Sequence, residues 1–228
     1  MNIRKPFFIV NPKSYIFGDD VLKLAKLADE LAQKYDIDCI FTGQLIDLPM
    51  IKKATKNLII TAQFMDSLTP GRGMGHVLPE ALKNQGVEAV VLNHAEKQLT
   101  LTEIDKTVKR AKEVGIMSIV CADTPEQCRA IAELHPTMMI CEPTSLIGTG
   151  NTSNEDYIRK TNEAIRTVDD KILIMQAAGV STGEDVRKVL TLGADGTGGT
   201  SGIINAPSWK DKLTEMMSAL VDYREEVK

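Results

Sequence analysis

The sequence predicts an α/β protein that folds as a single (β/α)8 barrel over residues 1–228, and three observations support this fold class. Eight short β-branched or apolar runs recur along the chain, and segments with 3.6-residue periodicity separate most of them. Dividing 228 residues by eight leaves 28.5 per unit, enough for one strand, one helix and two short loops. No Pro/Gly/Ser-rich linker, charge block or low-complexity tract interrupts the chain, so no domain boundary is predicted.

The predicted strands follow one another along the chain at regular intervals. They span Phe7–Asn11, Asp38–Phe41, Leu58–Gln63, Ala89–Asn93, Met117–Cys121, Thr137–Cys141, Ile172–Gln176 and a weak run at Thr197–Gly199. Alternation of strand and helix predicts a parallel sheet, and eight copies favour a closed barrel. The alternative is an open doubly wound sheet, which would need a Gly-rich phosphate turn after the first strand, where the chain reads NPKSY.

Six segments between these strands place apolar residues on one helical face. They cover residues 19–35, 100–115, 124–134, 154–168, 182–193 and 207–223. In the first segment, Val21, Leu24 and Leu31 share that face. Several segments begin at Thr, Asn or Ser, which are good N-caps, and two end at the C-cap candidates Gly115 and Gly193.

Composition and charge exclude several classes of function. Hydrophobic residues make up 43% and charged residues 25%, which is typical of a globular domain. Lys and Arg number 27 against 31 Asp and Glu, so no basic surplus exists for nucleic-acid binding. No apolar run approaches the ~18 residues of a membrane span, and the apolar patch near the N-terminus is too short for a signal peptide. The chain is therefore predicted to be cytoplasmic.

Cysteine and histidine spacing indicates neither a disulfide nor a metal site. No CxxC spacing joins the cysteines, and three of them lie in or beside apolar runs; the four are Cys39, Cys121, Cys128 and Cys141. No histidine shares an i, i+4 face with another histidine or a cysteine. His76 and His135 are interpreted as structural or surface residues, which leaves His94 for closer inspection.

Catalytic groups of a (β/α)8 barrel lie at the C-terminal ends of its strands, so the ends of the predicted strands identify candidate site residues. The side chains at or just beyond those ends are Asn11 and Lys13 after the first strand, His94 and Glu96 after the fourth, and Glu142 after the sixth. The turns after the seventh and eighth strands, AAGVSTGEDV and GGTSGII, offer small residues and bare N–H groups ahead of a helix, a pattern that binds phosphate. The run GTGGTSG nearly spells a dinucleotide motif, but Ser201 replaces its last glycine, so no dinucleotide cofactor is predicted.

Glu142 follows the apolar run TMMIC, so partial desolvation should raise its pKa and make it a general base. The alternative is a rim glutamate paired with a surface lysine. The next residues, 143–151, combine glycines with the apolar Leu146 and Ile147, which suits a lid that closes over a ligand. His94 could be a structural hydrogen-bonding residue or a catalyst, and Lys13 a surface charge or an anchor for an anionic substrate; the barrel rim favours the catalytic reading of both.

Four segments give the chain a family resemblance: IVNPKSY, AQFMDSLTPGRGMGHVLPEALKNQGVEAVVLNHAEK, ICEPTSLIGTG and AGVSTGEDVRKVLTLGADG. In this order and spacing they resemble the triosephosphate isomerase family, in the short form typical of archaea, over essentially the whole chain. The resemblance implies a TIM barrel that interconverts dihydroxyacetone phosphate and glyceraldehyde 3-phosphate in glycolysis and gluconeogenesis, with no cofactor and no metal.

The resemblance also implies roles for single residues. Glu142 would move a proton between two substrate carbons, His94 would polarise the carbonyl as a neutral electrophile, and Lys13 would hold the anionic substrate. Asn11 would assist beside the lysine and Glu96 would pair with it. The phosphate contacts would be Gly148, Gly179, Ser181, Thr200 and Ser201.

Assembly is implied in the same way. The loop SLTPGRGMGHVLPE mixes glycines with Met74, Val77 and Leu78, and an exposed patch of this kind would be sticky. By the resemblance this loop docks against a neighbouring subunit, so a homodimer or homotetramer is expected.

Several residues depart from the family pattern: Pro12, Ala95, Ala177, Gly198 and Gly199. Ala95 lacks the hydroxyl that would hold the catalytic glutamate in its resting position, and the two glycines of the last strand predict an emptier barrel interior. Flexible methionines could fill that space, namely Met138, Met139 and Met175. Two alternatives stay open: the same isomerisation of a four-carbon sugar phosphate, and a non-catalytic sugar-phosphate-binding paralogue.

Overall fold

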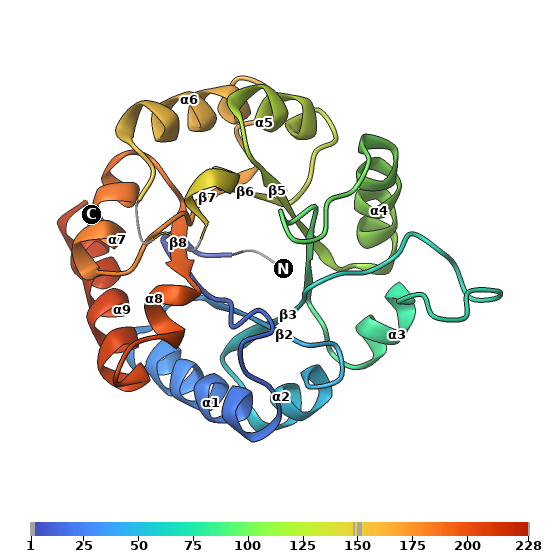
Figure 1. The fold of residues 1–228 in the computed structure, drawn as a ribbon, viewed down its shortest axis with the longest axis horizontal. Coiled ribbons are helices and arrows are strands. Elements are labelled where there is room, and N and C mark those ends of the chain that lie inside the picture. The colour runs from blue at the N-terminus through green and yellow to red at the C-terminus, as the bar shows by residue number, and fades with distance from the viewer. Residues whose placement is uncertain (1–2, 148, 150–151, 228) are drawn as a thin grey trace.

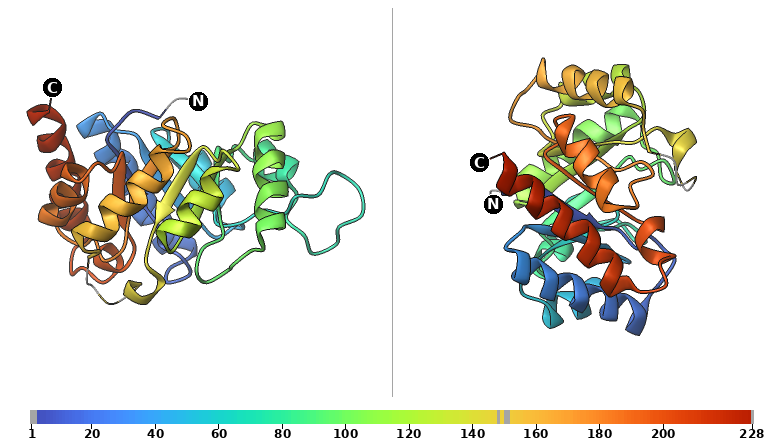
Figure 2. Two further views of the ribbon diagram at one scale, coloured as in Figure 1. Left: turned by 90° about the horizontal axis from the view of Figure 1, so that it is seen from above. Right: turned by 90° about the vertical axis from the view of Figure 1, so that its left-hand side faces the viewer.

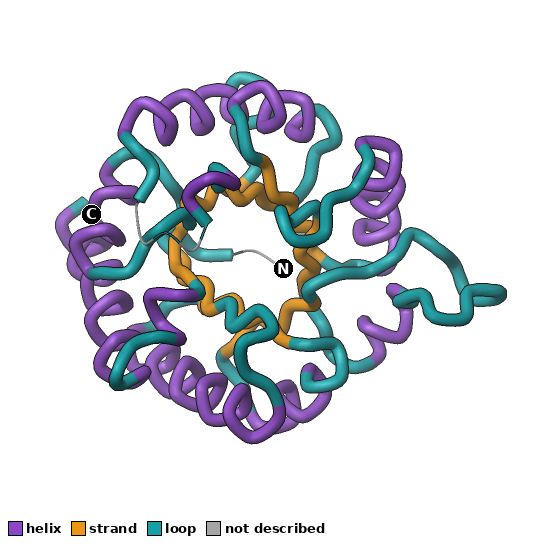
Figure 3. The backbone as a smooth tube through the Cα atoms, in the orientation of Figure 1, coloured by secondary structure: helices purple, strands orange, loops and turns teal. Residues whose placement is uncertain are grey.

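Eight parallel strands form a closed ring inside an outer layer of helices in this computed structural model, which describes residues 3–147, 149 and 152–227 (Figures 1 and 3). Each strand pairs with the next in sequence, and β8 pairs with β1. The fold is the predicted (β/α)8 barrel, the TIM barrel. Its strands are β1 (Phe7–Val10), β2 (Cys39–Gly43), β3 (Leu58–Ala62), β4 (Ala89–Leu92), β5 (Met117–Ala122), β6 (Met138–Cys141), β7 (Leu173–Gln176) and β8 (Gly196–Gly199).

Over the described residues, the structure contains the six predicted helices and three short ones that the sequence does not predict. Capping by Thr100, Thr124, Asn154, Thr182 and Ser208 is confirmed, because each side chain accepts a backbone N–H of the helix it precedes. The short helices α2, α3 and α8 were not predicted, since four to seven residues are too few to show periodicity. The helices are α1 (Gly18–Tyr35), α2 (Leu48–Ala54), α3 (Pro79–Asn84), α4 (Leu101–Val114), α5 (Pro125–Ala132), α6 (Glu155–Arg166), α7 (Gly183–Thr191), α8 (Ser201–Ile204) and α9 (Trp209–Glu226), with a 3-10 turn, η1, at Thr144–Leu146.

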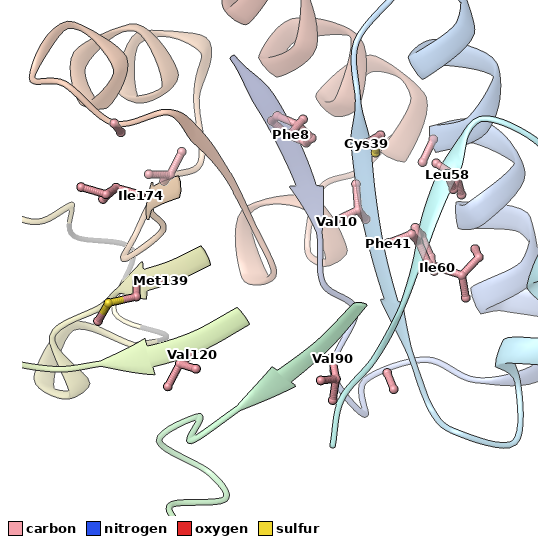
Figure 4. Packing of buried hydrophobic residues seen from close by; sticks show 14 of the residues in the cluster. Phe8, Val10, Cys39, Phe41, Leu58, Ile60, Val90, Val120, Met139 and Ile174 are labelled. Carbon is pink, nitrogen blue, oxygen red and sulfur yellow. The ribbon is translucent and has the colours of Figure 1, made fainter. Parts of the chain in front are cut away.

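Alternate strand residues build two apolar layers. Side chains such as Phe8 and Val10 pack outward against the helices, where Met139 also lies (Figure 4). Their neighbours Phe7 and Ile9 point into the barrel and meet inward residues of the other strands. Burial of both faces explains why the strands read as continuous apolar runs. Among the described residues, no helix is long and apolar enough to cross a membrane.

The glycines of β8 do not leave the interior empty, which corrects the sequence-based expectation. A Cβ at Gly199 would lie 2.9 Å from the carbonyl oxygen of Val180, and one at Gly196 would lie 2.4 Å from the Phe7 ring of the neighbouring strand β1. At Gly198 the backbone has a φ of +153°, and a Cβ would lie 2.0 Å from the carbonyl oxygen of Ile9. Glycine is needed there because two backbones approach closely. Met139 is wrong as a filler because it faces the helices.

One loop leaves the compact ring. The connection from β3 to α3 projects away from the barrel, as Figure 1 and the left view of Figure 2 show. At its neck two hydrogen bonds join Asp66 and Val77, because the Asp66 amide donates to the Val77 carbonyl and the Val77 amide donates to the Asp66 carboxylate. Met74 is fully exposed near the tip.

Candidate active site

Lys13 follows β1 in a left-handed backbone conformation, with a φ of +50°, that is uncommon for any residue with a side chain. Two neighbours hold it there. The amide of Lys13 donates to Asn11 Oδ1 at 3.0 Å, and Gln63 Nε2 at the end of β3 donates to the Lys13 carbonyl at 2.8 Å. Thr42 on β2 fixes Asn11 in turn by donating to the same Oδ1 at 2.6 Å. The hydrogen bonds from three strands therefore position the lysine backbone.

The Lys13 side chain crosses the mouth of the barrel to the loop after β4. Its Nζ lies 2.7 Å from Glu96 Oε1, and only 12% of the side chain is exposed. Burial of Glu96 opposes its ionisation, but the bond to the ammonium outweighs this and lowers the pKa of Glu96. The ion pair holds the ammonium group of Lys13 at the rim, next to His94.

His94 is neutral, and its proton is assigned by its partner. The amide of Glu96 donates to His94 Nδ1 at 3.1 Å, which makes Nδ1 an acceptor and leaves the hydrogen on Nε2. Burial lowers the pKa of His94, and the nearby charge of Lys13 lowers it further. An imidazole in this state offers Nε2–H as a hydrogen-bond donor to a substrate oxygen.

Glu142 follows β6 and faces the same end of the barrel. Its Oε2 lies 3.8 Å from His94 Nε2, beyond hydrogen-bond range, and both side chains are 16% exposed. Burial raises the pKa of Glu142, although the charge of Lys13 partly offsets the effect. The described residues give this carboxylate no hydrogen-bond donor. A raised pKa and free oxygens are the properties of a general base.

These groups surround a cavity of about 60 Å³. It opens beside a larger cavity of about 610 Å³, and the two share Asn11, Lys13, Val91 and His94. The smaller cavity is lined by Ile9, Asn11, Lys13, Tyr15, Val91, His94, Ile140, Glu142, Ile147, Met175, Ala177, Gly179, Val180, Gly199, Thr200 and Ser201. A base, a neutral donor and a cation thus converge on one small space, which suits proton transfer next to a carbonyl of an anionic molecule.

The two predicted phosphate turns differ in how many donors they leave unused. Before α8, no hydrogen bond within the described residues uses the amides of Ser201 and Gly202. Before α7, Ser181 and Thr182 already donate to Asp185, and Gly183 donates to Glu215. The expectation of bare N–H groups is therefore wrong for Ser181, Thr182 and Gly183, because carboxylates of the chain itself occupy these three amides, whereas no hydrogen bond within the described residues uses those of Gly179 and Val180.

The structure thus brings together most of the sequence-predicted site residues. Around the small cavity lie Asn11, Lys13, His94, Glu142, Gly179, Thr200 and Ser201, with Glu96 on the adjoining larger cavity. Ser181 does not line the small cavity. Gly148, with Gly150 and Asn151 of the predicted lid, lies outside the described residues.

Sequence reasoning missed Gln63 and Asp185. The sequence analysis places Gln63 only at the end of a strand, although a polar residue at the C-terminal end of a barrel strand is itself a candidate site residue. Asp185 stands three residues after Thr182, the spacing of a capping box, which identifies the cap but not the contacts to Ser181. Among the described residues, no three His, Cys, Asp or Glu side chains converge as a metal site requires.

Comparisons with known proteins agree on one family. Residues 6–217 match the family model described as "Triosephosphate isomerase". The chain is 34% identical over 221 residues to the triosephosphate isomerase of Methanothermus fervidus, covering 95% of this chain and 99% of that protein. It is 32% identical over 214 residues to that of Methanocaldococcus jannaschii, covering 92% and 97%. The corresponding protein of Caldivirga maquilingensis is 31% identical over 224 residues, covering 96% and 99%.

Proposed function

The chain belongs to the triosephosphate isomerase family, and on that premise we propose that Glu142, His94 and Lys13 carry out its reaction. It is an isomerase that interconverts dihydroxyacetone phosphate and glyceraldehyde 3-phosphate, a reaction of glycolysis and gluconeogenesis. The observation that supports the residue assignment is the single small cavity onto which the carboxylate, the neutral imidazole and the ammonium all open.

Each residue has one task in this proposal. Glu142 takes a proton from the substrate carbon next to the carbonyl and returns it to the neighbouring carbon, so no proton is consumed overall. His94 donates Nε2–H to the substrate oxygen on which negative charge develops, and Lys13 stabilises that charge. The resulting enediolate must be shielded from water, since it loses phosphate if it escapes. Ile147, which lines the cavity at the end of η1, is placed to exclude that water.

A coupled assay at nanomolar protein concentration tests the function. Turnover of glyceraldehyde 3-phosphate supports it, whereas stoichiometric binding without turnover identifies a non-catalytic sugar-phosphate-binding protein. The raised pKa of Glu142 favours turnover, because a binding protein gains nothing from a desolvated carboxylate beside an anion.

We also propose that residues 1–228 form one domain that acts in the cytosol as a homodimer or homotetramer. The projecting loop supports the assembly, because it leaves the barrel (Figure 1) and carries the fully exposed Met74, so it is free to pack against a second copy of the chain. Tyr15, Phe17 and Ile46, on the loops after β1 and β2, are exposed apolar side chains as well. Light scattering at micromolar concentration should give at least twice the 25.0 kDa of one chain, and a monomer would contradict the proposal.

A further inference from the structure

The carboxylate of Asp185, in the first turn of α7, binds more of the turn after β7 than a helix cap requires. Its Oδ2 accepts the Thr182 amide at 3.0 Å, and Thr182 Oγ1 accepts the Asp185 amide at 3.1 Å, which completes the capping box. The same Oδ2 also accepts the Ser181 amide at 3.0 Å and the Ser181 hydroxyl at 3.3 Å. Both donors of Ser181 are therefore directed at a carboxylate.

Ser181 is confined from the opposite side as well. A Cβ at Gly202 would lie 2.7 Å from both Cα and Cβ of Ser181, so α8 packs directly against this residue. A Cβ at Gly199 would lie 2.9 Å from the carbonyl oxygen of Val180. The backbone of β8 and α8 therefore packs closely against this turn, whose Ser181 donors point at Asp185.

The charge on this side of the mouth also opposes an anion. Asp185 and Glu215 together take three backbone amides at the start of α7, those of Ser181, Thr182 and Gly183. A phosphate that approached Ser181 would meet a carboxylate of the same sign at short range, whereas the amides of Ser201 and Gly202 face no such competitor among the described residues.

We propose that Asp185 is a specificity-determining residue that limits phosphate affinity by occupying the donors of Ser181. A bound phosphate then either displaces the carboxylate or relies on amides that Asp185 does not hold, such as those of Ser201 and Gly202. In either case the negative charge of Asp185 weakens phosphate binding. This inference rests on the proposed function, because it requires a substrate phosphate at this end of the barrel.

The test measures the Kd of inorganic phosphate by calorimetry for the wild-type chain, Asp185→Asn and the control Glu184→Gln. Glu184 is an exposed carboxylate in the same helical turn that makes no contact with Ser181 among the described residues, so its loss removes the same charge from a position away from the donors, whereas Asp185→Asn replaces the charged acceptor on Ser181 by a neutral, weaker one. Asp185→Asn should bind phosphate about fivefold more tightly, the effect of one like charge at about 4 Å in water. Glu184→Gln should stay within about twofold, since an exposed charge at greater distance is screened.

Stability and kinetics separate this effect from a loss of the cap. Asn still offers an oxygen to Thr182, and Asp185→Gln is a second variant that keeps the acceptor, because Gln is a natural residue of capping boxes. KM for glyceraldehyde 3-phosphate should fall with kcat unchanged, whereas an unravelled α7 would lower kcat and the melting temperature. Equal Kd values in Asp185→Asn and Glu184→Gln, or weaker binding in Asp185→Asn, would overturn the inference. Absence of isomerase turnover in the wild-type chain would overturn the proposed function instead, and the calorimetric comparison would still decide the role of Asp185.

Discussion

The two halves of the barrel mouth are built from different kinds of contact. On the side of β1 to β4, side-chain hydrogen bonds join Asn11, Gln63, Lys13 and Glu96 into one network. On the side of β6 to β8, the carboxylate of Glu142 has no hydrogen-bond donor among the described residues, and the remaining groups are mostly backbone amides. The first half is fixed before any ligand arrives. In the second half, Asp185 and Glu215 hold the amides before α7, whereas Glu142 and the amides of Ser201 and Gly202 have no hydrogen-bond partner among the described residues.

The largest effect should come from Glu142, on the side of the mouth formed by β6 to β8. Glu142→Gln keeps the shape of the side chain but removes the base, so kcat should fall by about 1000-fold or more, within the range for general acid–base catalysis. Calorimetry with inorganic phosphate should show nearly unchanged binding, which separates lost chemistry from lost folding. Activity within about tenfold of the wild type would mean that another group takes the proton.

The second prediction concerns the size of the substrate. The backbone of Ile9 closes the space at Gly198 and the carbonyl oxygen of Val180 closes the space at Gly199, so neither glycine enlarges the site. The kcat/KM for glyceraldehyde 3-phosphate should therefore exceed that for four-carbon aldose and ketose phosphates by about 100-fold or more, which is about 2.7 kcal/mol of transition-state preference. A tetrose phosphate converted as efficiently as the triose would contradict this prediction.

A smaller effect should follow from removing one hydrogen bond on the side of the mouth formed by β1 to β4. Gln63→Leu keeps the volume but removes the donor to the Lys13 carbonyl, so the strained lysine backbone loses one of its two supports. The kcat/KM should fall about tenfold, corresponding to one hydrogen bond of about 1.4 kcal/mol. Gln44→Leu is the matched control, because Gln44 Nε2 donates instead to Ser14 Oγ at 2.6 Å. Equal losses in both variants would contradict a specific role for Gln63.

The smallest effect should be a shift in pH dependence. Glu142 must be ionised to accept a proton and His94 must be neutral, so kcat/KM should fall as the pH drops through their pKa values. The charge of Glu96 raises the pKa of both groups. Removing it in Glu96→Gln should therefore move the acid limb of the profile to lower pH, whatever happens to the maximal rate.

The control for this shift is Glu113→Gln. Glu113 is a carboxylate on α4 that pairs with Arg110 and does not line either cavity at the mouth. Its variant should keep the wild-type midpoint. An acid limb that stays in place or moves to higher pH in Glu96→Gln would mean that neither Glu142 nor His94 sets it.

The same contrast explains what the sequence could predict. Strands such as β1 and β3 were found because burial on both faces demands continuous apolar residues, and Lys13, His94 and Glu142 were found because they stand at strand ends. The occupancy of the amides before α7 could not be predicted. Ser181 and Asp185 are visible in the sequence, but hydrogen-bond direction depends on how closely α8 packs against the turn. The filling of the last strand by Phe7 was missed for the same reason, since it depends on a neighbour almost a full chain length away.

The seam between β1 and β8 also has a consequence for how the chain reaches this fold. Phe7 lies opposite Gly196, so the first and last strands of the ring meet only after nearly all of the polypeptide has been synthesised. Until then β1 has an open edge, and its Phe7 ring lacks the glycine surface on which it rests. The glycines of β8 add little apolar area of their own. The pairing of β8 with β1 is therefore stabilised by backbone hydrogen bonds and by the packing of the Phe7 side chain against Gly196. A nascent chain that ends before Gly196 would therefore expose the unpaired edge of β1, which could pair with another incomplete copy. Closure of the barrel would be among the last steps of folding.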